Sequence, residues 1–317
     1  MITQIKGINE AAWIVEAGGN KAEILPEIGG NLIGLWIHGT EVFHHYDTYA
    51  EIQEAATSYG LPLLFPPNRI DAGHFEYAGK EYQFDINEPA TGNSLHGFLH
   101  DKAWKMEILK DTSDEAVVRL YYNADENTEF YRVYPVTFLA EMIYTLNAEG
   151  LKQEVRITNT GKEVMPYGIG WHTAFRIAPD TKMQVSVADR VQMSERTLPT
   201  GTLLELSADE KKMRCEGLDP VYAEMDDHFT SDPIDGFHGA ILTHPSEGVR
   251  VVYKVDPLYK HWMIWNAWQN GSFICIEPQN WRVNAPNLPI PAEESGMAAL
   301  EAGETLVATA TVIVENL

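Results

Sequence analysis

The sequence predicts an all-β protein, a large β-sandwich with few short helices. Two observations support this fold class: the dominant hydrophobic periodicity is two residues, and glycine, asparagine, aspartate or proline separates most of the strand-like runs. The chain has 317 residues, of which 44% are hydrophobic, which is enough for a large core. Because no serine- or glycine-rich linker divides the chain, we expect residues 1–317 to form a single domain.

The strand-like runs are distributed along most of the chain. Residues 151–158 (LKQEVRIT) alternate between leucine, glutamine, valine and isoleucine on one face and charged or polar residues on the other, which indicates a half-buried strand. Similar runs occupy residues 117–122, 183–187, 249–255 and 305–314. Residues 75–84 (FEYAGKEYQF) predict a hairpin in which Phe75 and Tyr77 face Tyr82 and Phe84 across a turn at residues 78–80.

Two segments end in residues with a clear structural meaning. Residues 51–60 are the best candidate for a short helix, and Gly60 stands in the usual stop position. Ile274 and Ile276 suit a buried strand, which we expect to stop at Pro278 because proline cannot donate a ladder hydrogen bond. Glu277 lies directly before this proline, and a carboxylate at such a position is solvated, paired or ready for proton transfer.

The composition excludes several classes of function. With 23 basic and 46 acidic residues, the net charge of −23 repels nucleic acids and anionic membranes, so we expect neutral or cationic partners. Cys215 and Cys275 are the only cysteines, which excludes a disulfide framework and favours a reducing compartment. The N-terminus lacks a signal pattern, and no apolar run approaches the roughly 18 residues of a membrane span. We therefore expect a soluble cytoplasmic protein.

Five stretches combine strand ends or turns with polar residues that packing does not explain: residues 65–70, 93–98, 168–175, 223–229 and 274–281. They supply Arg69, His96, His172, Asp227 and Glu277. Taken alone, such histidines and arginines are more often structural residues than catalytic ones, and a turn cap explains the aspartate equally well. The glutamate is the strongest candidate, because a solvated surface position does not fit a carboxylate between a buried-type strand and a proline.

No metal site is predicted. The histidines and acids lack the spacing of zinc and calcium motifs. His44, His45 and Asp47 imitate a metal site, but neighbouring residues on a strand point to opposite faces, so we interpret them as a solvated polar segment.

In their order along the chain, these stretches resemble the aldose 1-epimerase, or galactose mutarotase, family. The motifs are PPNRI, G-x-F-x-Y-x-G-K-x-Y, N-x-L-H-G-F, G-x-x-W-H, L-P-T-G, D-H-F, and C-I-E-P-Q-N-W followed by A-P-N. The resemblance implies a galactose-mutarotase-like β-sandwich whose concave face binds a free sugar without a cofactor. It further implies these roles: Glu277 as the base, His172 as the acid, and Arg69, His96, Asn68 and Asp227 as sugar-binding residues. Asp226 could take the place of Asp227 after a shift of one residue.

The chemistry of mutarotation fits these residues. The reaction removes the proton of the anomeric hydroxyl and protonates the ring oxygen, so a carboxylate and an imidazolium suffice, each contributing about 10²- to 10⁴-fold. We expect Glu277 to be ionised and exposed at the floor of a cleft, held by sugar hydroxyls and not by a basic partner. Among Trp262, Trp265, Trp268 and Trp281, most should lie in the core, and one or two should form an apolar wall for a pyranose.

Two segments depart from the family pattern and leave the substrate open. Residues 172–176 read HTAFR where many members have HPYFN, and residues 282–287 read RVNAPN where many have PDAPN. If Arg176 or Arg282 faced the cleft, a sugar phosphate or an acidic sugar would be the substrate. We expect both arginines on the surface in ion pairs, and a neutral aldohexose as substrate. The residues are also compatible with a non-catalytic sugar-binding protein and with a glycoside hydrolase. We expect a monomer or a dimer.

Overall fold

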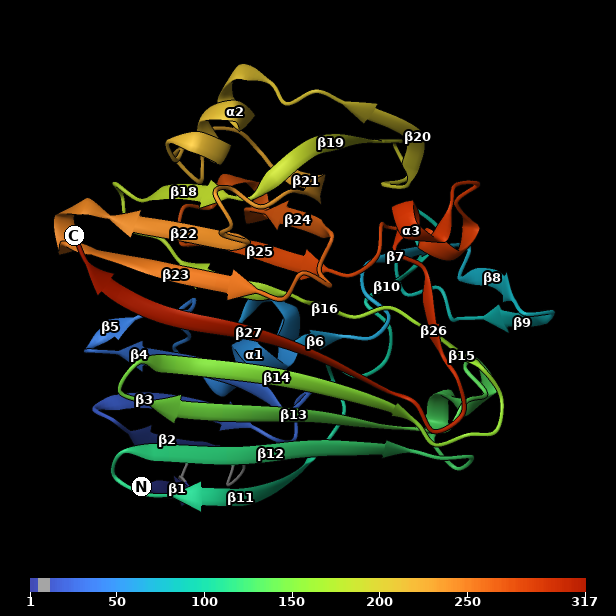
Figure 1. Ribbon diagram of the computed structural model, residues 1–317, viewed down its shortest axis with the longest axis horizontal. Coiled ribbons are helices and arrows are strands. Elements are labelled where there is room, and N and C mark those ends of the chain that lie inside the picture. The colour runs from blue at the N-terminus through green and yellow to red at the C-terminus, as the bar shows by residue number, and fades with distance from the viewer. Residues whose placement is uncertain (5–11) are drawn as a thin grey trace.

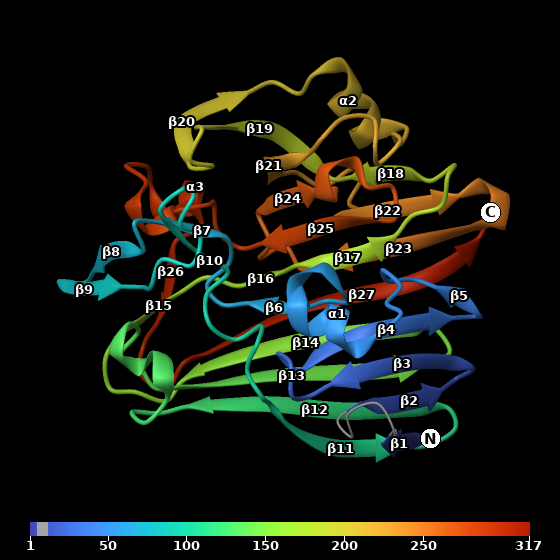
Figure 2. The ribbon, with the colours of Figure 1, turned by 180° about the vertical axis from the view of Figure 1, so that it is seen from behind.

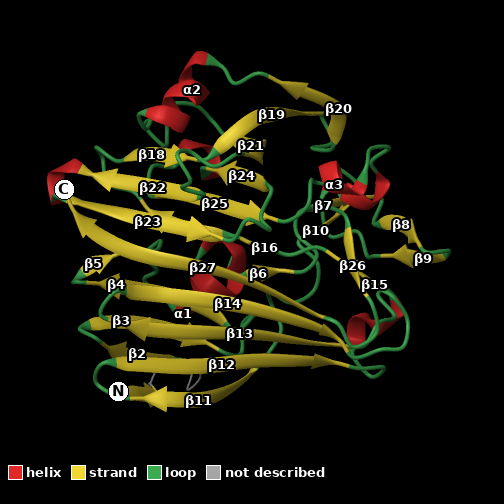
Figure 3. Ribbon diagram, in the orientation of Figure 1, coloured by secondary structure: helices red, strands yellow, loops and turns green. Residues whose placement is uncertain are grey.

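The computed structural model describes residues 1–4 and 12–317, and antiparallel strands dominate it (Figures 1 and 3). One layer is a sheet of eight strands that faces the viewer in Figure 1. In sheet order it contains β11 (Lys105–Asp111), β12 (Glu115–Ala124), β13 (Phe138–Asn147), β14 (Gly150–Asn159), β27 (Thr305–Asn316), β23 (Val249–Val255), β22 (Gly239–His244) and β18 (Lys182–Val185). Alternate side chains of β13 and β14 are buried, as the two-residue periodicity requires.

A second sheet of eight strands carries most of the polar residues singled out in the sequence. In order it contains β20 (Pro199–Leu204), β19 (Val187–Met193), β21 (Asp226–Ser231), β24 (His261–Trp265), β25 (Phe273–Gln279), β16 (Gly170–Trp171) and β6 (Leu63–Leu64), while β17 (Thr173–Arg176) also pairs with β25. Figure 2, seen from behind, shows this sheet beside a five-stranded meander. The meander contains β1 (Ile2–Gln4), β2 (Trp13–Ala17), β3 (Asn20–Leu25), β4 (Asn31–Ile37) and β5 (Thr40–Glu41).

The main core lies between these layers. One cluster of buried apolar side chains takes Val155 from β14, Leu35 from β4 and Ile276 from β25, all at most 1% exposed. Three two-stranded ribbons complete the sheets: β7 (Arg69–Asp71) with β10 (Asn93–Leu95), β8 (His74–Tyr77) with β9 (Lys80–Gln83), and β15 (Met165–Tyr167) with β26 (Ala298–Leu300). The β-sandwich expected from the periodicity is therefore confirmed.

The helices are short, also as expected. They are α1 (Tyr49–Glu54), α2 (Ala208–Cys215) and α3 (Ala292–Ser295), with 3₁₀ turns η1 (Ala56–Ser58), η2 (Glu129–Arg132), η3 (Pro245–Glu247), η4 (Ala267–Gln269) and η5 (Ala285–Asn287). The helix predicted over residues 51–60 is α1 followed by η1, so the α-helix ends before Gly60. The helix α2 was not predicted, although Ser207 and Glu210 form a capping box at its start. None of the helices in the described part of the chain has the length and apolarity that a membrane crossing needs.

Most predicted strands lie within observed ones, with two corrections. The run at residues 183–187 is not one strand, because the chain passes at Ser186 from the first large sheet to the second. The Ser186 backbone N–H donates to the Gly239 carbonyl, and its side-chain oxygen accepts from the Gly239 N–H. In the hairpin at residues 75–84, Phe75 pairs with Tyr82 as predicted, but the turn has only two residues, and Lys80 already pairs with Tyr77.

The prediction that Pro278 ends the strand of Glu277 is wrong. β25 continues to Gln279, and Pro278 pairs with Trp262 of β24. On the other side of β25, β17 pairs up to Ile276 and β16 pairs at Gln279, so the described ladder is interrupted between these two residues. The missing N–H of Pro278 falls in this interruption, which explains why a proline fits within the strand.

Candidate active site

The five polar stretches meet at one cavity of about 270 Å³ on the face of the second large sheet that turns away from the core. The cavity is lined by Thr57, Asn68, Arg69, Glu88, Leu95, His96, His172, Asp226, Trp265, Trp268 and Glu277. These residues come from the whole range between η1 and β25, and the fold alone brings them together.

Glu277 is the most deeply placed acid of this cavity. On β25, Ile276 points into the core, so the alternation of the strand turns Glu277 to the cavity face. The residue is only 2% exposed. Its Oε1 lies 3.1 Å from Nε2 of His172, and its Oε2 accepts a hydrogen bond of 3.3 Å from Nε2 of Gln279. The expectation of an exposed carboxylate without a basic partner is therefore wrong, because Glu277 is buried against an imidazole.

Burial sets the proton distribution of this pair. It raises the pKa of Glu277 well above its usual range and lowers the pKa of His172 to about 3. Both shifts favour a protonated carboxyl beside a neutral imidazole. Because the two groups are within hydrogen-bond distance, moving this one proton from Glu277 to His172 gives a carboxylate base beside an imidazolium acid.

His172 lies in the short break between β16 and β17. Its backbone N–H donates to the Pro62 carbonyl at 3.1 Å, which ties the break to the segment before β6. The ring of His96 stands perpendicular to that of His172, at 5.1 Å between centroids, and the Trp265 ring lies at 5.9 Å. The imidazole is thus held between a second histidine and an indole.

The loops that carry Asn68 and His96 depend on left-handed backbone conformations. Asn68 has φ 58° and His96 has φ 63°, and the His96 N–H donates to the Asn68 carbonyl at 3.0 Å. Gly97 follows with φ 64°, and a Cβ at this position would lie 2.0 Å from the Phe65 carbonyl oxygen. Only glycine fits there without moving the backbone, so the N-x-L-H-G-F motif encodes the position of His96.

Arg69 joins two carboxylates at the cavity wall. Its Nε and Nη2 donate to both oxygens of Glu88 at 2.8–3.1 Å, and its Nη2 lies 3.5 Å from Oδ2 of Asp226. Burial opposes ionisation of Glu88, but hydrogen bonds from Arg69 and Thr91 more than offset it and lower its pKa. The guanidinium is therefore neutralised by protein groups, and it orients Asp226 toward the cavity.

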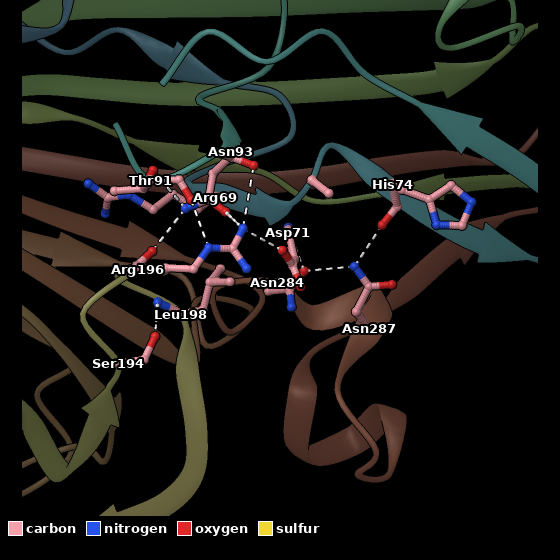
Figure 4. Close-up of polar contacts among 12 residues, drawn as sticks. Arg69, Asp71, His74, Thr91, Asn93, Ser194, Arg196, Leu198, Asn284 and Asn287 are labelled. Atoms are coloured by element: carbon pink, nitrogen blue, oxygen red, sulfur yellow. Dashed lines mark hydrogen bonds and ion pairs between the residues drawn. The ribbon is translucent and has the colours of Figure 1, made fainter. Parts of the chain in front are cut away.

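A second network fixes the ribbon that carries Arg69 (Figure 4). Nη2 of Arg196 donates to Oδ1 of Asp71 at 2.7 Å, and the side chain of Asn93 donates back to the Arg196 carbonyl at 2.9 Å. On the other side, the backbone N–H of Asp71 donates to the side-chain oxygen of Asn284. The backbone N–H of Asn284 in turn donates to the Arg69 carbonyl. The turn at residues 194–197 and the segment that follows β25 therefore hold β7 in place.

The structure distinguishes the two neighbouring aspartates by position. Asp226 lines the cavity, whereas Asp227, which the sequence favoured, does not. Both lie on β21, where adjacent side chains point to opposite faces. Asp227 forms an ion pair with Arg190, which also contacts buried Glu210 at 2.8 Å. Burial raises the pKa of Asp227 to about 6.

Neither arginine of the departing segments lines the cavity. Arg176 forms a paired contact with Glu247 at 2.6–2.9 Å, as expected of a surface ion pair. The expectation for Arg282 is wrong, because its side chain is buried and the residue is 5% exposed. No carboxylate of the described residues lies within ion-pair distance of it, and its Nε has no hydrogen-bond partner among them. Burial lowers the pKa values of His228 and His261, and the positive charge of Arg282 lowers them further.

Three polar residues at the site were not predicted. Glu88 gave no motif signal beyond an acid before Pro89, and its partner Arg69 lies 19 residues earlier, on β7. Gln279 stands two residues after Glu277, so the strand period places both on one face, and this signal was available. Thr57 belongs to a 3₁₀ turn within the segment predicted as a helix.

Of the four tryptophans named in the sequence, Trp262 and Trp281 are buried, whereas Trp265 and Trp268 line the cavity.

Solved structures of other proteins share this fold. The structure is similar over its full length to a galactose mutarotase-like protein from Clostridium acetobutylicum, with a TM-score of 0.95, 28% identity and coverage of 100% of this chain and 99% of that chain. It also resembles the galactose 1-epimerase of Lactobacillus acidophilus NCFM in fold, with a TM-score of 0.79, 15% identity and coverage of 100% and 98%. The architecture is thus the galactose mutarotase-like β-sandwich.

The family follows from the match of the sequence. Residues 14–312 match the family described as Aldose 1-epimerase, and the chain belongs to this family. Among curated proteins, the uncharacterized protein YphB of Escherichia coli (strain K12) is 25% identical over 294 residues, covering 90% of this chain and 93% of YphB. The resemblance found in the ordered motifs is therefore confirmed.

Proposed function

We propose that this protein is a cofactor-independent aldose 1-epimerase that interconverts the α and β anomers of a free, neutral aldohexose. The observation that carries the proposal is the contact of 3.1 Å between His172 and Glu277 at the floor of the cavity. The anomeric hydroxyl and the ring oxygen of a pyranose are bonded to the same carbon. An acid and a base that must act on both atoms therefore have to stand side by side, as these two residues do.

The proposed reaction needs only proton transfers. The Glu277 carboxylate takes the proton of the anomeric hydroxyl, the carbonyl forms as the bond from C1 to the ring oxygen breaks, and the His172 imidazolium protonates the ring oxygen. Rotation about C1–C2 then presents the other carbonyl face, and the two transfers run in reverse. While the sugar is open, the pair holds a protonated carboxyl and a neutral imidazole, the state that burial favours.

The remaining cavity residues are suited to bind hydroxyls. Asp226, held by Arg69, offers a carboxylate with a side chain 42% exposed, and His96 stands against the proposed acid. Trp265 supplies an apolar surface for the C–H face of the ring. Because Glu88 and Asp226 already neutralise Arg69, the cavity offers no free cation among its described lining residues, which supports a neutral substrate over a sugar phosphate or an acidic sugar.

The test is polarimetry of freshly dissolved α-D-galactose and α-D-glucose with catalytic amounts of protein. We expect faster approach to equilibrium rotation than in buffer, no release of reducing sugar from a glycoside, and a lower kcat/KM for glucose 6-phosphate than for glucose. Folded protein that binds either sugar without accelerating mutarotation would be a sugar-binding protein and not an epimerase. Release of sugar from the glycoside would favour a hydrolase.

A further inference from the structure

An exposed tryptophan stands at the same cavity as the proposed acid and base. Trp268 is 72% exposed, which is unusual for a large apolar side chain, and it lines the cavity together with His172 and Glu277. Its ring meets the ring of Trp265 edge-on, at 5.7 Å and 85°. Trp265 in turn lies 5.9 Å from the ring of His172, so Trp268 stands one ring farther from the acid than Trp265 does.

The backbone beneath Trp268 adopts an unfavourable conformation. Ala267, Trp268 and Gln269 have φ values of 46°, 57° and 61°, three consecutive left-handed residues without a glycine. This conformation is unfavourable for every residue except glycine, because the Cβ of an L-amino acid comes too close to the following carbonyl oxygen. The turn therefore persists only because its surroundings impose it.

Buried Asn266 imposes this conformation. Its side chain donates to the carbonyls of Ala223 at 2.7 Å and Pro220 at 3.1 Å, and it accepts from the N–H groups of Met225 at 3.0 Å and Gln269 at 3.3 Å. The Gln269 side chain adds a hydrogen bond of 2.9 Å to the Val221 carbonyl. The indole is thus held out into solvent by a fixed support, and the support is tied to the segment that precedes β21 and Asp226.

The depth of the cavity decides which part of a sugar reaches Trp268. Glu277 is almost fully buried at the floor, and its proposed partner atom is the anomeric hydroxyl on C1. A pyranose bound in this way points the opposite side of its ring, where C4 lies, toward the mouth. A substituent on the oxygen of C4 therefore leaves the cavity past the exposed indole, while the anomeric hydroxyl stays free for ring opening.

We propose that Trp268 forms a second sugar subsite, in which the non-reducing ring of a 1,4-linked reducing disaccharide packs its C–H face on the indole. This inference rests on the proposed 1-epimerase function, because it uses the position of the anomeric hydroxyl at Glu277. The exposed side chain of Glu224 follows Ala223, whose carbonyl accepts from Asn266, and its carboxylate provides an acceptor for hydroxyls of the second ring. Both features suit a neutral disaccharide.

The experiment compares mutarotation of lactose and maltose with that of galactose and glucose in wild-type protein, Trp268→Ala and Trp268→Phe. Because Trp268→Ala removes the apolar face on which the second ring packs, we expect the ratio of disaccharide to monosaccharide kcat/KM to fall by about tenfold, which equals about 1.4 kcal/mol. Trp268→Phe should recover part of this ratio because it keeps an aromatic face. Leu204→Ala, an exposed apolar residue at the end of β20, is the matched control and should leave the ratio unchanged.

An unchanged ratio in Trp268→Ala would overturn the subsite, including the case in which both sugar classes lose activity equally. Calorimetric titration of lactose and galactose into Glu277→Gln protein tests the subsite independently of catalysis. We expect lactose to bind more tightly than galactose, and the added substitution Trp268→Ala to abolish this difference. If wild-type protein shows no mutarotation but this binding difference is found, the proposed catalytic function fails and the subsite stands. Equal affinities in both proteins overturn the subsite.

Discussion

Replacing the proposed base is the most direct test of the mechanism. Glu277→Gln keeps the size of the side chain and allows contacts with both His172 and Gln279, but an amide cannot take up the anomeric proton. General base catalysis contributes at least about 10²-fold, so kcat should fall by that factor or more, which equals about 2.7 kcal/mol of lost transition-state stabilisation.

The same substitution should barely affect the fold. Because burial raises the pKa of Glu277, the site already favours an uncharged side chain, and glutamine introduces no new charge to desolvate. We expect the free energy of unfolding, measured in urea, to fall by no more than about 1 kcal/mol, the net contribution of one hydrogen bond. Exposed Glu205, which does not line the cavity, gives the control Glu205→Gln, which should match wild type in rate and stability.

The assay is the initial change of optical rotation of α-D-galactose, corrected for the uncatalysed rate. A Glu277→Gln turnover within a few-fold of wild type would remove this residue from the mechanism. Loss of activity together with a large loss of stability would instead assign it a structural role. Retained galactose binding in calorimetry distinguishes a catalytic role from a structural one.

Three further predictions follow from the geometry. His172→Asn should lower kcat by at least about 100-fold, whereas His96→Asn should raise KM more than it lowers kcat. A larger loss of kcat in His96→Asn than in His172→Asn would make His96 the acid. Asp226→Asn should raise KM by about tenfold, because it weakens a hydrogen bond to a charged group, while Asp227→Asn should leave KM unchanged. A larger increase of KM in Asp227→Asn would make Asp227 the sugar ligand. Burial lowers the pKa of His172 to about 3 and raises the pKa of Glu277. The active state, in which these two residues share one proton, should therefore persist as the pH falls below 6.5, and kcat/KM should decline only at much lower pH. An acid limb centred at 6.5 in folded protein, checked by circular dichroism, would contradict this.

Much of the fold could be predicted because the sheets repeat a simple pattern. Each of the strands β14 and β27 has one largely buried face, so their two-residue periodicity was visible in the sequence. The transition at Ser186 was not visible, because apolar residues alternate without interruption from Met183 to Val187, and the contacts of Ser186 with Gly239 mark the change of sheet only in the structure. The periodicity identifies strands but does not say to which sheet each belongs.

The candidate site was predictable as a set of residues but not as a geometry. The ordered motifs brought Glu277 and His172 into one hypothesis, yet the burial of both depends on which neighbours cover the sheet. The choice between Asp226 and Asp227 required the strand register, since one residue of shift exchanges the two faces. Buried Arg282 is a similar case, because long arginine side chains are usually exposed and no local pattern indicates otherwise.

The wide sequence range of the cavity residues links the proposed sugar binding to the folding pathway. Thr57, Arg69, His172 and Glu277 become neighbours only after both halves of the chain have docked, and such long-range contacts form slowly because closing large loops costs entropy. Recovery of sugar binding during refolding should therefore lag behind the recovery of secondary structure. By mass action, a sugar at about 100 times its Kd should stabilise the assembled fold by about 2.7 kcal/mol, so bound sugar protects distant parts of the chain together.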